Sequence, residues 1–246
     1  MNGPVRGPKP VLCAFDLDGT VTACEMLPVI ARLAGLGDVV SMLTRLTLSG
    51  QISFERSFRM RFALLRRLPL AMVHRAVEAI PLDPDIESFI RRRKTQCALI
   101  TGNLDLWIAP LVKRLGCRCF SSRGMIAGKG LRLLSILDKG RAVTRLNKEG
   151  WRVIAVGESV NDVPMLDAAA VGVAFAGVHR PVPEIRRMAH YQAANGADLC
   201  ALLESLAGPL AEAEDLTPAK AESPASEEAG PVAPPSLPEI LEEMTP

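Results

Sequence analysis

Short apolar runs that end in polar residues recur along the chain and predict buried strands. Residues 10–15 read PVLCAF and stop at Asp16, and similar runs occupy residues 96–100, 152–156 and 171–175. A run of about five apolar residues without alternation is typical of a strand that is buried on both faces of a parallel sheet. We therefore expect these four runs to form the centre of one sheet.

Helical patterns separate these strands, at about residues 105–115, 139–149 and 162–169. Alternation of strand and helix predicts βαβ units, so the expected fold class is α/β with a parallel sheet as its core. In an open sheet of this kind, ligands bind beyond the carboxyl ends of the strands. The polar residues that directly follow the strands are therefore the candidate site residues.

One long segment, from about residue 25 to residue 80, breaks the alternation. Its apolar residues keep helical spacing, with glycine and proline residues between them, and no strand pattern occurs. This predicts three or four helices inserted after the first strand, above the strand ends like a lid. We expect a catalytic core at 10–23 and 82–206, and an inserted helical cap at 24–81.

The two ends of the 246-residue chain differ in composition from the rest. Residues 1–9 are predicted to form a flexible leader. Residues 207–246 hold nine acids, one base, eight of the 19 prolines and no aromatic residue. Such a segment cannot bury enough apolar surface to offset its ordering entropy, which predicts a disordered acidic Pro/Ala-rich tail. Within it, residues 236–244 combine helical apolar spacing with an S-x-x-E capping pattern, which is typical of a short docking motif for a protein partner. The alternative is that the apolar residues have this spacing by chance.

Charge and cysteine content narrow the function classes. Residues 1–206 carry 28 bases and 18 acids, a net charge of +10, which fits an anionic partner such as phosphate. No aromatic residues interleave with the basic clusters, so a nucleic-acid partner is not expected. No run of 18 apolar residues occurs, so no membrane span is expected. The six cysteines include no C-x-x-C pair, which indicates reduced thiols in a cytoplasmic protein.

The first polar group at a strand end is DLDGT, which contains Asp16 and Asp18. Two carboxylates at positions i and i+2 can serve one reaction centre, because one can attack while the other moves a proton. A cation would make their closeness tolerable. A surface turn and a D-x-D metal site of the glycosyltransferase kind are the alternatives.

Three further groups follow in sequence order. The hydroxyl of Thr101 and the amide of Gly102 can hold a phosphate oxygen at a strand end. Lys139, at the predicted start of a helix, can neutralise a phosphate and a carboxylate together. Glu158 and Asp162, in GESVND, offer the hard oxygen ligands that suit Mg²⁺. Taken singly, each group has a plain alternative: a turn, a solvated lysine or a helix N-cap.

Together and in this order, DLDGT, TGN, the lysine and GESVND resemble the four motifs of the haloacid dehalogenase (HAD) superfamily of phosphohydrolases, over about residues 11–206. The helical insert is similar to the small C1-type cap of the phosphoserine phosphatase branch. Glu25 and Arg61 match cap residues that meet the ammonium and the carboxylate of the substrate in that branch. The alternative is that Glu25 favours a helix N-terminus and Arg61 is one more base of a basic cap.

The resemblance implies a Rossmannoid parallel-sheet core and a Mg²⁺-dependent phosphomonoesterase that acts on a small phosphorylated metabolite. The substrate that it favours is phosphoserine, which would place the enzyme in serine biosynthesis. Asp16 would attack phosphorus and form an aspartyl-phosphate, and Asp18 would protonate the leaving oxygen and then activate water. The side chains of Thr101 and Lys139 and the amide of Gly102 would stabilise the phosphoryl group.

The same resemblance implies a ligand set for Mg²⁺. The Asp16 carboxylate, the Asp18 carbonyl and Glu158 would hold the ion, and Asp162 would support the metal site. Asn161 would touch the substrate or its phosphate.

Three departures from the branch pattern leave the substrate open. Glu158 stands where the branch usually has Asp, Thr101-Gly102-Asn103 stands where it has S-G-G, and Gly19 stands where it commonly has Ser. The alternatives are hydrolysis of another small phosphate, phosphotransfer to another alcohol, and a non-catalytic phosphate-binding regulatory protein.

Overall fold

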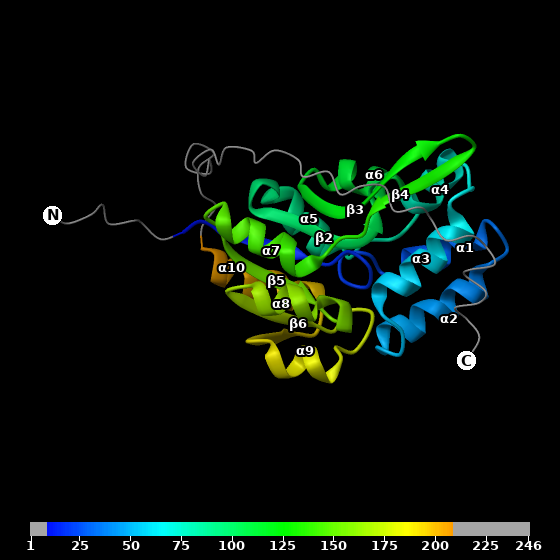
Figure 1. The fold of residues 1–246 in the computed structure, drawn as a ribbon. Helices are drawn as coiled ribbons and strands as arrows, with labels where there is room; N and C mark the ends of the chain where they lie inside the picture. Colours follow the sequence, from blue (N-terminus) through cyan, green and yellow to red (C-terminus); the bar gives the residue numbers. More distant parts are fainter. Residues whose placement is uncertain (1–8, 209–246) are drawn as a thin grey trace.

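The computed structural model describes residues 9–208, which form a sheet with helices packed against both of its faces (Figure 1). The interpretations of the leader and of the acidic tail, including the docking motif at 236–244, fall outside the described residues. Within residues 9–208, no helix combines the length and the apolar character needed to cross a membrane.

Seven strands form one sheet in the order β4-β3-β2-β1-β5-β6-β7. Their bounds are β1 Val11–Phe15, β2 Cys97–Leu104, β3 Arg118–Ala127, β4 Gly130–Ser135, β5 Arg152–Gly157, β6 Val171–Phe175 and β7 Tyr191–Ala193. All neighbouring strands are parallel except β3 and β4, which form an antiparallel hairpin. The predicted α/β class with a parallel sheet is confirmed, and all four predicted strands are present.

The helices follow the expected alternation. They are α1 Met26–Arg32, α2 Gly37–Leu48, α3 Phe54–Leu65, α4 Leu70–Glu78, α5 Pro84–Arg92, α6 Asp105–Leu115, α7 Lys139–Lys148, α8 Val163–Ala168, α9 Pro183–Met188 and α10 Gly196–Ala207, with the short 3-10 helices η1 Lys94–Gln96 and η2 Val160–Asp162. Four helices, α1 to α4, occupy the segment in which three or four were expected, and α6, α7 and α8 match the other predicted helices.

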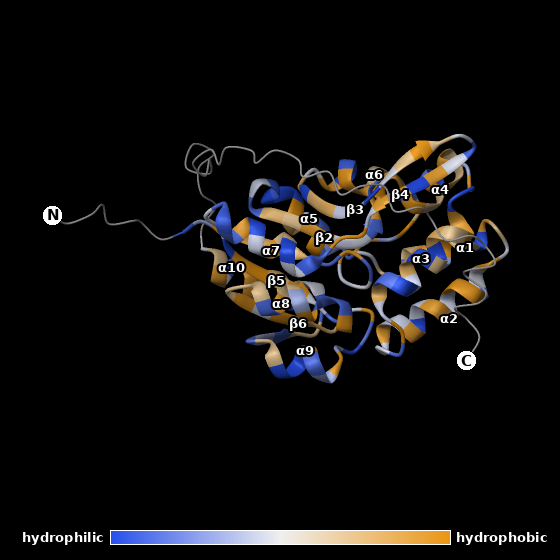
Figure 2. Cartoon of the chain, in the orientation of Figure 1, coloured by the Kyte–Doolittle hydropathy of each residue, from blue (hydrophilic) through white to orange (hydrophobic). Residues whose placement is uncertain are grey.

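Burial on both faces explains why the strand sequences do not alternate. In β1, Cys13 and Phe15 face a core that includes residues of α5, α6 and α10, whereas Leu12 and Ala14 face a second core with residues of α7, α8 and α9. The central strands are accordingly apolar along their length, while the covering helices present polar residues outward (Figure 2). An apolar side chain on either face of such a strand is removed from water.

The helices α1 to α4 lie to one side of the sheet, beyond the strand ends (Figure 1). The chain enters and leaves this segment at adjacent points, because Thr22 and Leu82 form an isolated antiparallel bridge. The segment packs on α6, where the ring of Trp107 lies 6.5 Å from that of Phe58 and 5.8 Å from that of Phe62 between centroids. These contacts seat the helical segment over the strand ends.

The sequence analysis missed the hairpin formed by β3 and β4, and also the short strand β7. Much of the hairpin is partly or fully exposed, so it lacks the apolar run that marks the central strands. Its turn reaches the helical segment, where the Leu131 amide donates to the Arg66 carbonyl at 2.9 Å. β2 is also longer than predicted, since it continues to Leu104 with an irregular register after Ile100.

Candidate active site

The predicted site residues meet in one cavity between the strand ends and the helical segment, with about 480 Å³ of empty space that is partly open to solvent. Those that line it are Asp16, Asp18, Glu25, Arg61, Thr101, Gly102, Lys139, Glu158 and Asn161. Asp162 lies just behind this lining and is fully buried. Parallel strands bring their carboxyl ends to one edge, which explains why residues from β1, β2 and β5 converge here.

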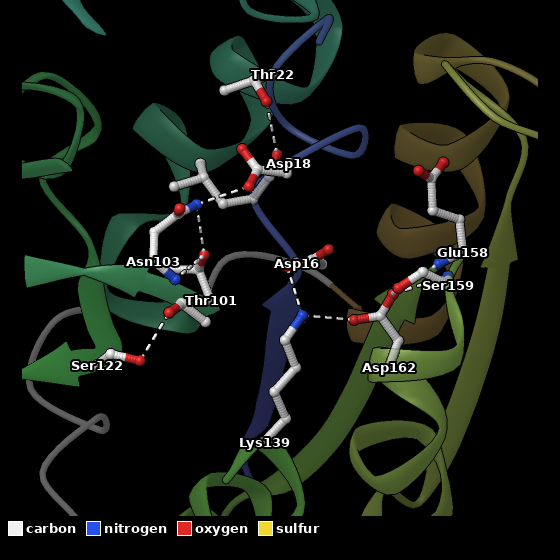
Figure 3. Close-up of polar contacts among 12 residues, drawn as sticks. Asp16, Asp18, Thr22, Thr101, Asn103, Ser122, Lys139, Glu158, Ser159 and Asp162 are labelled. Atoms are coloured by element: carbon white, nitrogen blue, oxygen red, sulfur yellow. Dashed lines mark hydrogen bonds and ion pairs between the residues drawn. The ribbon is translucent and has the colours of Figure 1, made fainter. Parts of the chain in front are cut away.

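Lys139 joins two carboxylates at the floor of the cavity (Figure 3). Its Nζ donates to Asp16 Oδ1 and to Asp162 Oδ1, at 2.6 Å in each case, and all three side chains are buried. Burial alone would lower the pKa of Lys139, but the two carboxylates raise it above its usual value. Burial, followed by repulsion from Asp162, raises the pKa of Asp16 against the opposing effect of Lys139. Lys139 is therefore held as a cation beside Asp16.

The second oxygen of Asp162 organises the loop after β5. Asp162 Oδ2 accepts hydrogen bonds from the Glu158 amide at 3.0 Å, the Ser159 amide at 2.9 Å and the Ser159 hydroxyl at 3.0 Å. The Ser159 part of this pattern is a capping box that opens η2. Both carboxylate oxygens of Asp162 are thus engaged by donors, and they fix Lys139 and the backbone that carries Glu158.

Asp18 is held by groups from two different elements. Its Oδ2 accepts from Asn103 Nδ2 at 2.7 Å, and its Oδ1 accepts from the Met26 amide at 3.2 Å. Burial, then the charges of Glu25 and Asp16, raises the pKa of Asp18 well above its usual value. These surroundings therefore favour the protonated form of the Asp18 carboxyl.

Asn103 is a site residue that the sequence analysis noted only as a departure from the S-G-G pattern. Besides holding Asp18, its amide Nδ2 and its backbone N–H lie 3.2 Å from Thr101 Oγ1. Ser122 on β3, also missed, donates to the Gly102 carbonyl at 2.7 Å. The position of Asn103 directly after a predicted strand was the available signal, whereas Ser122 had none because β3 was not predicted.

Arg61 and Glu25 lie on the helical segment and line the cavity together with the residues from the strand ends. Arg61 is 4% exposed, and burial lowers its pKa to about 10. Its Nε donates to the Ser57 carbonyl at 3.3 Å and its Nη1 to Thr44 Oγ1 at 3.2 Å. The remaining nitrogen, Nη2, has no hydrogen-bond partner among residues 9–208. A buried guanidinium with an unpaired donor fits an anionic group such as a carboxylate.

Two glycines are required by close approaches inside the cavity. A Cβ at Gly102 would lie 2.0 Å from the ring of Phe54, so only glycine lets α3 come this close to β2. Gly19 has a φ of +73°, and a Cβ there would lie 2.2 Å from Glu158 Oε1. In Figure 3 the Glu158 carboxylate points away from Asp162 and Lys139. Gly19 therefore leaves the space that this carboxylate occupies.

The donor set fits a divalent cation with oxygen ligands. Four acids line the cavity, Asp16, Asp18, Glu25 and Glu158, against the two bases Lys139 and Arg61. Burial, then the charges of Asp16, Asp162 and Glu25, raises the pKa of Glu158 to about 9. A bound cation would stabilise the ionised form of these crowded, buried or partly buried carboxyl groups, and hard carboxylate oxygens suit Mg²⁺.

The fold and the site define a class of phosphoryl-transfer hydrolase, and a family comparison agrees. The haloacid dehalogenase-like hydrolase family matches residues 13–167, and the chain belongs to this family. The implied HAD-like fold is thereby confirmed.

Two curated relatives of the chain are phosphoserine phosphatases. The chain is 31% identical to a phosphoserine phosphatase of Archaeoglobus fulgidus over 67% of its own length and 52% of the relative's. It is 30% identical to a phosphoserine phosphatase of Methanocaldococcus jannaschii over 68% of its own length and 86% of the relative's. The match therefore spans about half of the first relative and most of the second.

Solved structures give the same picture. A phosphoserine phosphatase that carries an analogue of the phospho-aspartyl intermediate superposes with a TM-score of 0.68 and 26% identity, over 80% of this chain and 99% of that one. A substrate-bound phosphoserine phosphatase superposes with a TM-score of 0.69 and 26% identity, over 81% and 99% of the two chains.

Proposed function

We propose that this phosphoric monoester hydrolase is a Mg²⁺-dependent phosphoserine phosphatase that forms an aspartyl-phosphate on Asp16. The observation that carries the proposal is the pair of opposite charges above Asp16: the buried Arg61 with its unpaired Nη2, and the carboxylate of Glu25. A guanidinium and a carboxylate in one small cavity complement the carboxylate and the ammonium of a phosphorylated amino acid. The names of the relatives support the same substrate.

The chemistry at the floor of the cavity starts with Asp16. Its carboxylate oxygen attacks phosphorus, the bond from phosphorus to the serine oxygen breaks, and Asp18 donates a proton to the departing oxygen. Asp18 then takes a proton from water, which attacks the aspartyl-phosphate and releases inorganic phosphate. The raised pKa of Asp18 suits it to both steps, and Asn103 keeps its carboxyl in place.

Positive charge and hydrogen-bond donors surround the phosphoryl group. Lys139 holds the attacking carboxylate at 2.6 Å and offsets the charge that builds up as phosphate is transferred. The Thr101 hydroxyl, the Gly102 amide and Asn161 line the same cavity and complete the phosphate subsite. Asp162 maintains this arrangement by fixing Lys139 from behind.

Mg²⁺ would be held by Asp16, Asp18 and Glu158, and Asp162 would support this set through the loop that it organises. When bound, the ion supplies positive charge that allows an anionic nucleophile and an anionic phosphate to approach each other. Residues 24–81 would act as the cap that closes over this site and carries the substrate-reading residues. All six cysteines are free thiols, which supports a cytoplasmic location.

The test of substrate class is Arg61→Ala, assayed on phosphoserine and on an aryl phosphate without a carboxylate. A lost buried charge contact is worth about 2–5 kcal/mol, so KM for phosphoserine should rise by at least about 30-fold. KM for the aryl phosphate should change far less, because that substrate never made the contact. The matched control is Arg59→Ala on the same helix, where the arginine is exposed and pairs with Glu55. An equal rise in KM for both substrates in Arg61→Ala would reject the proposal that Arg61 binds the substrate carboxylate.

A further inference from the structure

His179 brings a nitrogen ligand to the edge of the cavity, and neither the motifs nor the proposed mechanism uses it. It lies in the loop after β6, and its side chain is 42% exposed. Its Nε2 is 3.5 Å from Glu25 Oε1, and its backbone N–H lies 3.4 Å from Glu158 Oε2. Three segments far apart in sequence therefore meet at this point.

The spacing of these groups fits a metal ion shared by all three side chains. One ligand atom from each of Glu25, Glu158 and His179 can be chosen so that all three lie within 4.8 Å of one another. Good hydrogen bonds to nitrogen are about 2.7–3.2 Å long, so the 3.5 Å contact is loose for one. Ligands at about 2.0–2.1 Å from a tetrahedral zinc ion are about 3.3 Å apart. The 3.5 Å between His179 Nε2 and Glu25 Oε1 is close to that value.

The surroundings of Glu158 fix the direction in which its carboxylate points. Glu158 is 2% exposed, and its carboxylate lies against Gly19, pointing away from Lys139 and Asp162 (Figure 3). A Cβ at Gly19 would also come within 3.4 Å of His179 Cδ2, so the same empty space borders both side chains. His179 remains accessible from solvent, which gives an ion a route of entry.

We propose that Glu25, Glu158 and His179 form a binding site for a borderline divalent cation, Zn²⁺ in the first instance. An imidazole with two carboxylates favours Zn²⁺ over Mg²⁺, since Mg²⁺ prefers oxygen ligands alone. Glu158 belongs to this set and to the proposed Mg²⁺ set, so the two cations compete for it. The regulatory consequence rests on the proposed function: an ion bound here withdraws Glu25 from the substrate ammonium and inhibits hydrolysis of phosphoserine.

The deciding experiment measures binding of Zn²⁺ alone to the chelator-treated full-length protein by calorimetry, so it requires no turnover. His179→Ala should weaken Zn²⁺ binding at least about 10-fold, the scale on which metal sites respond to altered coordination. Its affinity for Mg²⁺, measured in the same way, should change less than about twofold, because the imidazole is not in that set. Equal Zn²⁺ affinity in wild type and His179→Ala would overturn the proposal.

Two control variants test whether a different imidazole or a thiol binds the Zn²⁺ ion. His74→Gln removes an imidazole that contacts the Leu106 carbonyl and is not part of the cluster, and Cys24→Ser removes the thiol next to Glu25 in sequence. Both should bind Zn²⁺ like wild type, and loss of binding in Cys24→Ser equal to that in His179→Ala would reject the assigned ligand set. Failure of the wild type to hydrolyse phosphoserine would reject the proposed function and leave this binding test decisive.

Discussion

Gly19 and Glu158 form a pair in which the smaller residue makes room for the larger, and the substitution Gly19→Ala tests this coupling. The new Cβ would lie 2.2 Å from Glu158 Oε1, whereas an ordinary contact begins at 3.4 Å, so the carboxylate must move by about 1.2 Å. Metal–ligand distances tolerate only about 0.2 Å, so a displacement of this size removes Glu158 from the proposed Mg²⁺ set. The Kd for Mg²⁺ should therefore rise at least about 10-fold.

The same substitution in a Glu158→Asp background should behave differently. The side chain of Asp is one methylene shorter, which withdraws the carboxylate by roughly 1 Å or more and clears the new Cβ. We expect Gly19→Ala to raise Kd less than about threefold in that background, measured by calorimetry against Glu158→Asp alone.

Backbone strain provides an internal control for this cycle. Gly19 has a φ of +73°, and alanine in that region costs about 1–2 kcal/mol. Urea denaturation without metal should show this cost in both backgrounds, since it does not depend on residue 158. An equal loss of Mg²⁺ affinity in both backgrounds would show that the new Cβ does not act through Glu158, and the reasoning would be refuted.

Three further outcomes are expected. Asp16→Asn should lower kcat by about 10³-fold or more because an amide is a poor nucleophile, and near-normal turnover by the folded variant would exclude the mechanism. Glu158→Ala should raise the half-saturating Mg²⁺ concentration by about 10-fold or more, and an unchanged value would remove Glu158 from the metal site. Glu204→Gln should cost about 1 kcal/mol after solvent screening, because Glu204 accepts from the buried Arg93. Hydrogen bonding by Arg93 lowers the pKa of Glu204, so this contribution is full above the unfolded pKa of about 4.3 and is lost as pH falls through the lower folded pKa. Urea denaturation at pH values above and below that window checks the last prediction, and a pH-independent difference would contradict it.

Much of the fold was predictable because a strand buried on both faces has an uninterrupted run of apolar residues in its sequence. β1, β5 and β6 are covered on both faces, so each is an uninterrupted apolar run whose limits agree closely with the prediction. The hairpin β3–β4 was not predictable in this way, since much of it faces solvent and its sequence carries no comparable pattern. Local patterns report how a segment is buried, and a partly exposed hairpin is buried too little to be distinctive.

The sequence alone determined the α/β class, the helical insertion and the set of acids and bases at the strand ends, because each depends on residues close together in the chain. Only the tertiary structure decided which of these groups touch. The sequence does not reveal that Lys139 lies 2.6 Å from both Asp16 and Asp162, or that Arg61 is buried with one nitrogen unpaired. Contacts such as that between His179 and Glu25 join loops more than a hundred residues apart, and their geometry depends on the sheet order and on how the helical segment packs above it. Periodicity along the chain carries information about burial, whereas the meeting of distant side chains is set by the packing of the whole molecule.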